Sequence, residues 1–146
     1  MNELVGGLRA AIRSAQPETP ENEQPLLSAA VGTYAERVYL AEAQDWKRWV
    51  EDGLLEFAVP MTYTLDDRMF RYMVEGFASG PRSDRIWIGH GTWLFAKRPD
   101  GALAQLEVAR SAGARGEVLF SYDSIAEFPA LRDALLAHFG ESTGER

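Results

Sequence analysis

The chain has 146 residues, of which 46% are hydrophobic, 11% aromatic and 25% charged. This length is typical of one compact domain and excludes a complete (β/α)₈ barrel, which needs about 250 residues. The composition is that of a soluble globular protein with a real core, and it excludes the disordered and fibrous classes.

The net charge of −7, from 22 acidic and 15 basic residues, argues against a nucleic-acid-binding surface. The chain contains no cysteine, which excludes disulfides, thiolate metal sites and cysteine nucleophiles. No segment approaches the roughly 20 apolar residues of a membrane span, and the N-terminus lacks the pattern of a secretory signal. We therefore expect the chain as written to be cytoplasmic, while a full-length parent could still be secreted.

Apolar spacing predicts the elements in chain order. An amphipathic helix is expected over residues 3–15, followed by a proline-rich connector over 16–25. Short apolar runs are expected to form strands near residues 26–31, 55–61, 85–90 and 117–121. Helices are expected to alternate with them over residues 41–52, over 68–78, after Gly101 up to an end at Gly113, and over 128–139. Residues 1–140 should form a single domain, and residues 141–146 a disordered tail.

The order of elements is one helix followed by four βα units. Continuous apolar strands separated by helices of about 10 to 15 residues are typical of a parallel sheet with right-handed crossovers. At about 30 residues per unit, four units account for the chain from Pro25 onward, whereas eight would make a barrel. We therefore predict an α/β fold that is half of a TIM (β/α)₈ barrel, with a parallel four-stranded sheet.

Four motifs in the chain resemble those of one known family. Residues 44–63, QDWKRWVEDGLLEFAVPMTY, resemble the QDW..W...G..D...PM.Y signature of the family 10-like glycosyl hydrolase domain. Residues 27–31, 88–91 and 109–122 resemble, in the same order, that family's fifth strand, the glycine-rich end of its seventh strand and its eighth unit. The resemblance covers residues 3–137, and the combination is more specific than any single motif.

The resemblance implies a glycosyl hydrolase-like barrel of which this chain holds only the C-terminal half. The family's first four strands, including a fourth-strand motif that supplies an acidic residue, have no counterpart here. Glu56 stands where the family prefers aspartate, and His90 where a small or apolar residue is common. The implied function is carbohydrate binding, with hydrolysis of O-glycosyl bonds when the barrel is complete and none by this chain alone.

Candidate catalytic residues are few. The reacting groups of a barrel lie at the carboxyl ends of its strands, and glycoside hydrolysis usually needs two carboxylates across the scissile bond. Asp123, just after the fourth strand, is the one weak candidate, and a turn or capping role is its alternative. Asp66 and Asp67 precede an amphipathic helix, where aspartate usually caps the helix.

Candidate substrate-binding residues also follow the strands: Met61, Tyr63, His90, Trp93 and Tyr122. Met61 and Tyr63 alternate with Thr62, so both should face the barrel interior while Thr62 faces the helices. Aromatic rings can stack on a sugar face, although Tyr63 could equally close the core. By the same parity argument Tyr122, rather than Ser121, should face inward. His90 has no second histidine or cysteine near it in the sequence, so a hydrogen-bonded structural role is its alternative, and we expect no metal and no cofactor.

The expected partners follow from the incomplete barrel. An oligosaccharide or cell-wall glycan is the expected ligand, and neither nucleic acid nor a membrane is expected. Four parallel strands leave two open edges and an apolar face, which proteins normally cover by pairing. Either a missing N-terminal half-barrel or a second copy could cover them. The alternative function is therefore a non-catalytic α/β binding module that homodimerises through its open sheet.

Overall fold

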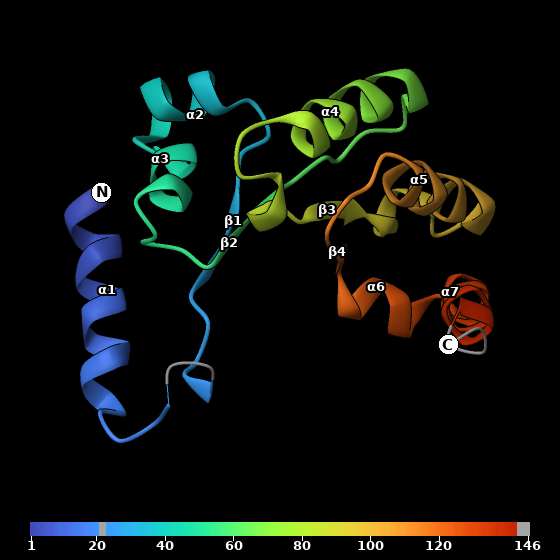
Figure 1. The fold of residues 1–146 in the computed structure, drawn as a ribbon. Helices are drawn as coiled ribbons and strands as arrows, with labels where there is room; N and C mark the ends of the chain where they lie inside the picture. The colour runs from blue at the N-terminus through green and yellow to red at the C-terminus, as the bar shows by residue number, and fades with distance from the viewer. Residues whose placement is uncertain (21–22, 143–146) are drawn as a thin grey trace.

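A computed structural model of the chain describes residues 1–20 and 23–142 (Figure 1). Its strands are β1 (Ser28–Val31), β2 (Phe57–Pro60), β3 (Ile88–Gly91) and β4 (Glu117–Phe120). Its α-helices are α1 (Asn2–Ala15), α2 (Ala35–Glu42), α3 (Trp46–Glu51), α4 (Asp67–Ser79), α5 (Pro99–Ser111), α6 (Tyr122–Glu127) and α7 (Pro129–Ser142). Two 3₁₀ helices, η2 (Ser83–Arg85) and η3 (Thr92–Phe95), flank β3.

The strands form two parallel pairs. β1 pairs with β2, with Ser28 opposite Phe57, and β3 pairs with β4, with Ile88 opposite Glu117. Between the pairs, the described residues form only isolated parallel bridges, Ala58 to Ile86 and Met61 to Gly89. The predicted α/β class with parallel strands is confirmed, whereas the structure shows two small sheets in place of the single four-stranded sheet.

Pro60 provides the physical reason for this interruption. The Trp87 amide donates to the Ala58 carbonyl at 3.0 Å, and the Thr62 amide donates to the Gly89 carbonyl at 3.0 Å. A regular parallel ladder would place a donor from residue 60 between these two bonds. Proline has no N–H, so that rung cannot form and the ladder between β2 and β3 stays incomplete.

Threonine side chains add to the backbone ladder at the carboxyl ends of the strands. Each hydroxyl donates to a carbonyl at the end of the following strand: Thr33 to Met61, Thr62 to Gly89 at 2.8 Å, and Thr92 to Phe120 at 2.8 Å. Thr62 and Thr92 are fully buried, so these bonds are shielded from water. They connect the strands in the order β1, β2, β3, β4.

The helices pack against one side of the strands (Figure 1). Val31 and Ala58 join a core with the tryptophans of α3, and Ile88 packs with residues of α4 and α5. A further cluster of η3, α5 and α7 takes in Leu119 of β4. Because side chains alternate along a strand, the residues between these positions face the other way.

This opposite side, here called the inner face, includes the large side chains Phe57, Val59, Trp87, Val118 and Phe120. The Phe57 and Trp87 rings stack with their centroids 4.2 Å apart. A Cβ at Gly116 would lie 2.3 Å from the Trp87 ring, so only glycine fits beside it. Except for Val59, which is buried, these side chains are partly exposed.

Several expected elements have different bounds. The helix expected over residues 41–52 is shorter and begins later, as α3, because Ala43 adopts the left-handed conformation with φ 54° and ends a separate helix, α2, that was not predicted. The Gln44 side chain then accepts a hydrogen bond from the Gly32 amide at 3.0 Å, which joins this break to the end of β1. Of the expected tail, residues 141–142 belong to α7, and residues 143–146 lie outside the described residues.

Candidate functional site

A cavity of about 480 Å³ opens where β1 and β2 end. Its walls come from the segments after these two strands and from α2 and α4, and they include Thr33, Tyr34, Met61, Tyr63 and Asp66. Ligands of barrel folds and of other parallel α/β folds bind at this carboxyl edge of the strands. Two of the residues predicted from the sequence, Met61 and Tyr63, are therefore found together in this strand-end cavity.

Tyr63 connects the cavity to the ends of β3 and β4. Its ring lies 5.4 Å from the ring of Phe120, measured between centroids and tilted by 60°. A Cβ at Gly91 would lie 3.1 Å from the Tyr63 ring, closer than most real contacts. The glycine after His90 thus makes room for the tyrosine, so the close approach predicted at this position is made by a neighbouring side chain.

The Tyr63 hydroxyl is buried and has no hydrogen-bond partner among the described residues. Burial raises the pKa of this phenol to about 12, so the hydroxyl keeps its proton at neutral pH. A buried hydroxyl without a partner costs about 1 to 3 kcal/mol relative to a bonded one. A polar ligand that bonded to this hydroxyl would remove that cost, and the side chains around it have to move to admit the ligand because the oxygen is inaccessible to water.

The charged residues of the cavity differ in their availability. One Asp66 carboxylate oxygen accepts hydrogen bonds from the Arg68 and Met69 amides at 2.9 and 3.0 Å, which confirms its predicted role as the cap of α4. Glu42 accepts a hydrogen bond from the Gln44 side chain at 3.2 Å. Arg37 has no ion-pair or side-chain hydrogen-bond partner within the described part of the chain. Among the described residues that line the cavity, the free cation is therefore Arg37.

His90 lies outside the cavity, on the helix-facing side of β3. It is 2% exposed, and its ring centroid is 5.4 Å from that of Phe70 in α4. Its Nε2 is 3.2 Å from Glu117 Oε1, but the pair misses hydrogen-bond geometry. The structure thus does not place His90 in the strand-end cavity. Neither ring nitrogen has a hydrogen-bond partner among the described residues, so the hydrogen-bonded structural role expected as the alternative is not seen either.

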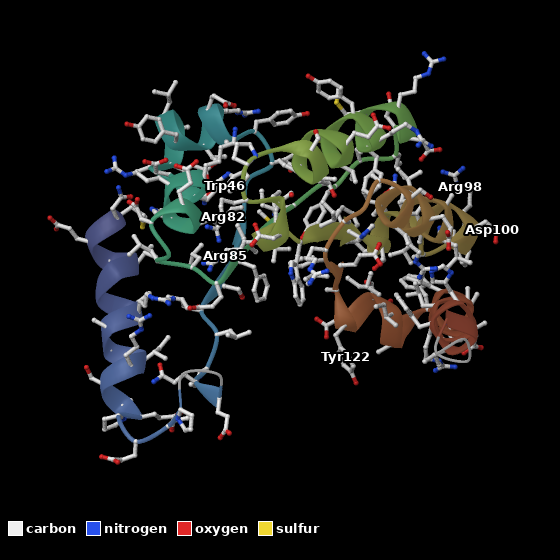
Figure 2. All side chains as sticks on the ribbon, viewed as in Figure 1. Trp46, Arg82, Arg85, Arg98, Asp100 and Tyr122 are labelled. Carbon is white, nitrogen blue, oxygen red and sulfur yellow. The ribbon has the colours of Figure 1, made fainter. Side chains whose placement is uncertain are left out.

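The remaining predicted residues are exposed. Trp93 is 49% exposed in η3, just beyond β3. Tyr122 is 81% exposed in the first turn of α6, and Figure 2 shows it pointing away from the rest of the chain. Asp123 is also exposed in that turn. None of these three residues lines the strand-end cavity.

Tyr122 does not face inward as expected, because β4 ends two residues before it. β4 stops at Phe120, and Ser121 caps α6 through a reciprocal pair of bonds with Ser124. Once the backbone turns into a helix, the alternation of side chains no longer applies. Phe120 faces inward instead and packs against Tyr63. Phe120 follows Val118 by two residues and therefore lies on the same side of the strand, and this spacing is the sequence signal that could have identified it.

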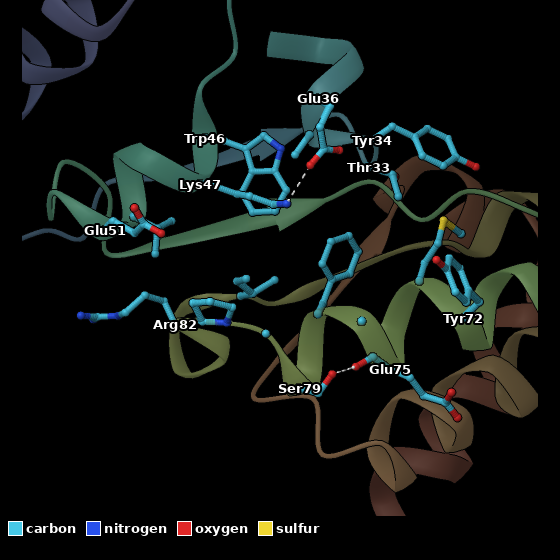
Figure 3. Close-up of a pocket in the computed structure, with 18 residues that line it drawn as sticks. Thr33, Tyr34, Glu36, Trp46, Lys47, Glu51, Tyr72, Glu75, Ser79 and Arg82 are labelled. Carbon is cyan, nitrogen blue, oxygen red and sulfur yellow. Dashed lines mark hydrogen bonds and ion pairs between the residues drawn. The ribbon is translucent and has the colours of Figure 1, made fainter.

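A second and larger groove, of about 610 Å³, lies between α3 and α4 on the helix-covered side (Figure 3). Trp46 and Phe77 form part of its apolar wall, edge to face at 6.0 Å. Lys47 and Glu36 form an ion pair of 3.2 Å at its rim. We place the candidate site at the strand ends despite the smaller volume, because the ends of β1 and β2 meet there in one ligand-sized space.

The described residues contain no group of three histidine, aspartate or glutamate side chains that could hold a metal ion. Among them there is also no helix with the length and apolar character needed to cross a membrane. Comparisons with protein-family models, with curated proteins and with solved structures found no match.

Proposed function

We propose that this chain is the C-terminal portion of a glycoside hydrolase-like barrel and that it binds a carbohydrate in the strand-end cavity. The observation that carries the proposal is Tyr63, whose ring packs at the convergence of the strands and whose buried hydroxyl has no partner. A flat ring with a polar tip suits the face and rim of a sugar. Four parallel strands connected in sequence order, with helices on one side, support the half-barrel.

The chemistry of the cavity supports binding more than hydrolysis by this chain. A glycosidase usually needs two carboxylates flanking the bond, one of them shielded so that it keeps its proton. Asp66 and Glu42 line the cavity, but both are exposed and both accept hydrogen bonds from their own neighbourhood. We therefore assign hydrolysis of O-glycosyl bonds to the complete barrel and sugar binding to this portion.

The experiment is a calorimetric or NMR titration of the purified chain with soluble oligosaccharides of several linkages. Tyr63→Ala should weaken binding more than about 10-fold, since it removes both a stacking surface and a hydrogen bond, and Tyr63→Phe about 5-fold. Tyr72→Ala is the matched control, because Tyr72 is 76% exposed on α4 and does not line this cavity. Equal affinities of the wild type and Tyr63→Ala would refute the assignment.

A further inference from the structure

The outer edge of β1 is open. No described strand pairs with the side of β1 that faces away from β2. The carbonyls of Leu27 and Val31 accept hydrogen bonds from the β2 segment. Because backbone groups alternate in direction along a strand, the N–H and C=O groups of Ser28 and Ala30 point to the open side.

The outer edge of β4 is open in the same way. β4 pairs with β3, and no described strand pairs with its other side. The Gly116 carbonyl accepts from the Ile88 amide at 2.8 Å, so residues 116, 118 and 120 direct their backbone groups toward β3. Glu117 and Leu119 therefore direct theirs outward. The row of strands begins and ends with an unsatisfied parallel edge.

We infer that a second copy of the chain completes the structure, so that two copies form one closed barrel of eight parallel strands. A two-fold axis along the barrel axis keeps all strands parallel and places β1 of each copy beside β4 of the other. The two seams are then equivalent, as a closed symmetric dimer requires. Eight strands is also the number at which side chains just fill the interior, and the inner face supplies apolar ones. The inference rests on the proposed function, because the second copy takes the place of the other half of the barrel and so completes the strand-end site.

The elements before β1 and after β4 leave apolar area uncovered. Five large apolar side chains, in α1, just before β1, in α6 and in α7, are 49% to 81% exposed: Leu4, Leu8, Leu26, Tyr122 and Leu136. Together they leave on the order of 400 Å² uncovered, at about 100 to 200 Å² for each complete side chain. A stable interface buries about 800 Å² per partner, so the partly exposed inner face has to contribute about the same area again.

The charges at the two edges are complementary. Glu23 precedes β1 and Arg115 precedes β4, while Arg37 follows β1 and Asp123 follows β4. Within the described residues, none of these four charges has an ion-pair partner. In a parallel seam, Glu23 comes to the same end as Arg115 of the partner subunit, and Arg37 to the same end as Asp123 of the partner subunit. Opposite charges thus meet at both ends of each seam.

Closure also completes the candidate site. The end of β1 forms one wall of the strand-end cavity, and the first turn of α6 in the partner comes next to it. Tyr122 and Asp123 are exposed in the single chain, but in the closed barrel they reach the mouth beside Arg37. The partner therefore adds one further aromatic ring and one further carboxylate to those that already line the cavity of one chain.

The test is the mass in solution, measured by light scattering and sedimentation equilibrium over a range of concentrations. The wild type should give twice the 16.3 kDa of one chain. Ala30→Lys puts a charge on an exposed position of the open edge and should give a folded monomer, as judged by circular dichroism. Leu40→Lys is the matched control, because Leu40 is 82% exposed on α2, and it should remain dimeric. A monomeric wild type with a cooperative thermal transition overturns the inference, and so does a dimer that Ala30→Lys leaves intact.

Hydrogen exchange on the unmodified chain gives an independent reading if Ala30→Lys fails to fold. The amides of Ser28, Ala30, Glu117 and Leu119 should be protected at high concentration and lose protection on dilution. Equal exchange of these amides at all concentrations overturns the second copy as partner. So does a monomer that becomes protected only with a separate polypeptide carrying four further βα units.

The oligosaccharide titration keeps the two proposals apart. A dimer that binds no sugar leaves closure in place and refutes the proposed function. A monomer that binds sugar through Tyr63 refutes closure and supports the function.

Discussion

Thr62 offers the sharpest test of how the two strand pairs are held together. Its side chain is 0% exposed, and its hydroxyl donates to the Gly89 carbonyl at 2.8 Å. Thr62→Val keeps the branched shape and removes only the donor. The Gly89 carbonyl still accepts from the Thr62 amide at 3.0 Å, so the substitution leaves no orphaned acceptor. The cost is therefore that of one net hydrogen bond, about 1 kcal/mol, and not the penalty of up to about 3 kcal/mol for an unsatisfied group.

The hydrogen bond from the Thr62 hydroxyl is important because it crosses between β2 and β3, where the backbone ladder is incomplete. Pro60 cannot donate between β2 and β3, so few backbone bonds cross that boundary. For a chain of this size, 1 kcal/mol corresponds to a fall of about 3 °C in Tm. Thermal and urea unfolding, followed by far-ultraviolet circular dichroism, measure the difference. Thr19→Val is the control, because Thr19 lies in the partly exposed connector and should change stability by less than about 0.5 kcal/mol.

Two results would refute this reasoning. If Thr62→Val unfolds at the same urea concentration as Thr19→Val, the hydroxyl contributes nothing and other contacts hold the pairs together. If it lowers the free energy of unfolding by more than about 3 kcal/mol, the loss exceeds one hydrogen bond and the valine must disturb the packing. Thr92→Val removes the equivalent bond to Phe120 inside a regular pair and serves as the reference.

Further outcomes are expected at other positions. Asp66→Ala should cost about 1 kcal/mol through loss of the α4 cap, whereas Asp66→Asn, which keeps the acceptor, should cost almost nothing in urea unfolding. Gly76→Ala, in the interior of α4 with open space around it, should raise the free energy of unfolding by about 0.5 to 1 kcal/mol; Gly116→Ala should lower it by about 1 to 3 kcal/mol because its Cβ meets Trp87. The folded pKa of Tyr63, about 12, lies above the unfolded value of about 10. The neutral phenol therefore contributes fully to the free energy of unfolding below pH 10, and this contribution is lost as the pH rises to 12. Tyr63→Phe should remove that part of the alkaline loss in stability profiles, and absorbance at high pH should lose its last-titrating tyrosine.

The parts of the fold that local signals specify could be predicted from the sequence. α4 has its apolar side chains at helical spacing, and Asp66 precedes it as a cap, so both its face and its start were expected. The parallel arrangement followed from short apolar runs that alternate with helices, and it is confirmed for both pairs. In each case the residues that specify the element lie within one helical turn or one strand.

The division of the strands into two pairs could not be predicted in the same way. Pro60 is visible in the sequence, but its consequence depends on which neighbour it faces and in what register. A proline directed toward an open edge costs nothing, whereas one directed toward β3 removes a rung. Register between strands about 30 residues apart is a tertiary property, so the same residue supports either outcome.

His90 shows how much of the candidate site depends on which side of a strand a residue occupies. Its glycine neighbours suggest a close approach, and the approach exists, but it lies on the inner side, where Gly91 makes room for Tyr63. His90 points the opposite way, toward Phe70 and Glu117. The sequence predicts correctly where the strand ends. It does not show whether the odd-numbered or the even-numbered side chains face the helices, because a strand that is buried on both sides is apolar at every position. A bulkier residue at position 91 should therefore disturb the cavity more than any substitution of the histidine between the glycines.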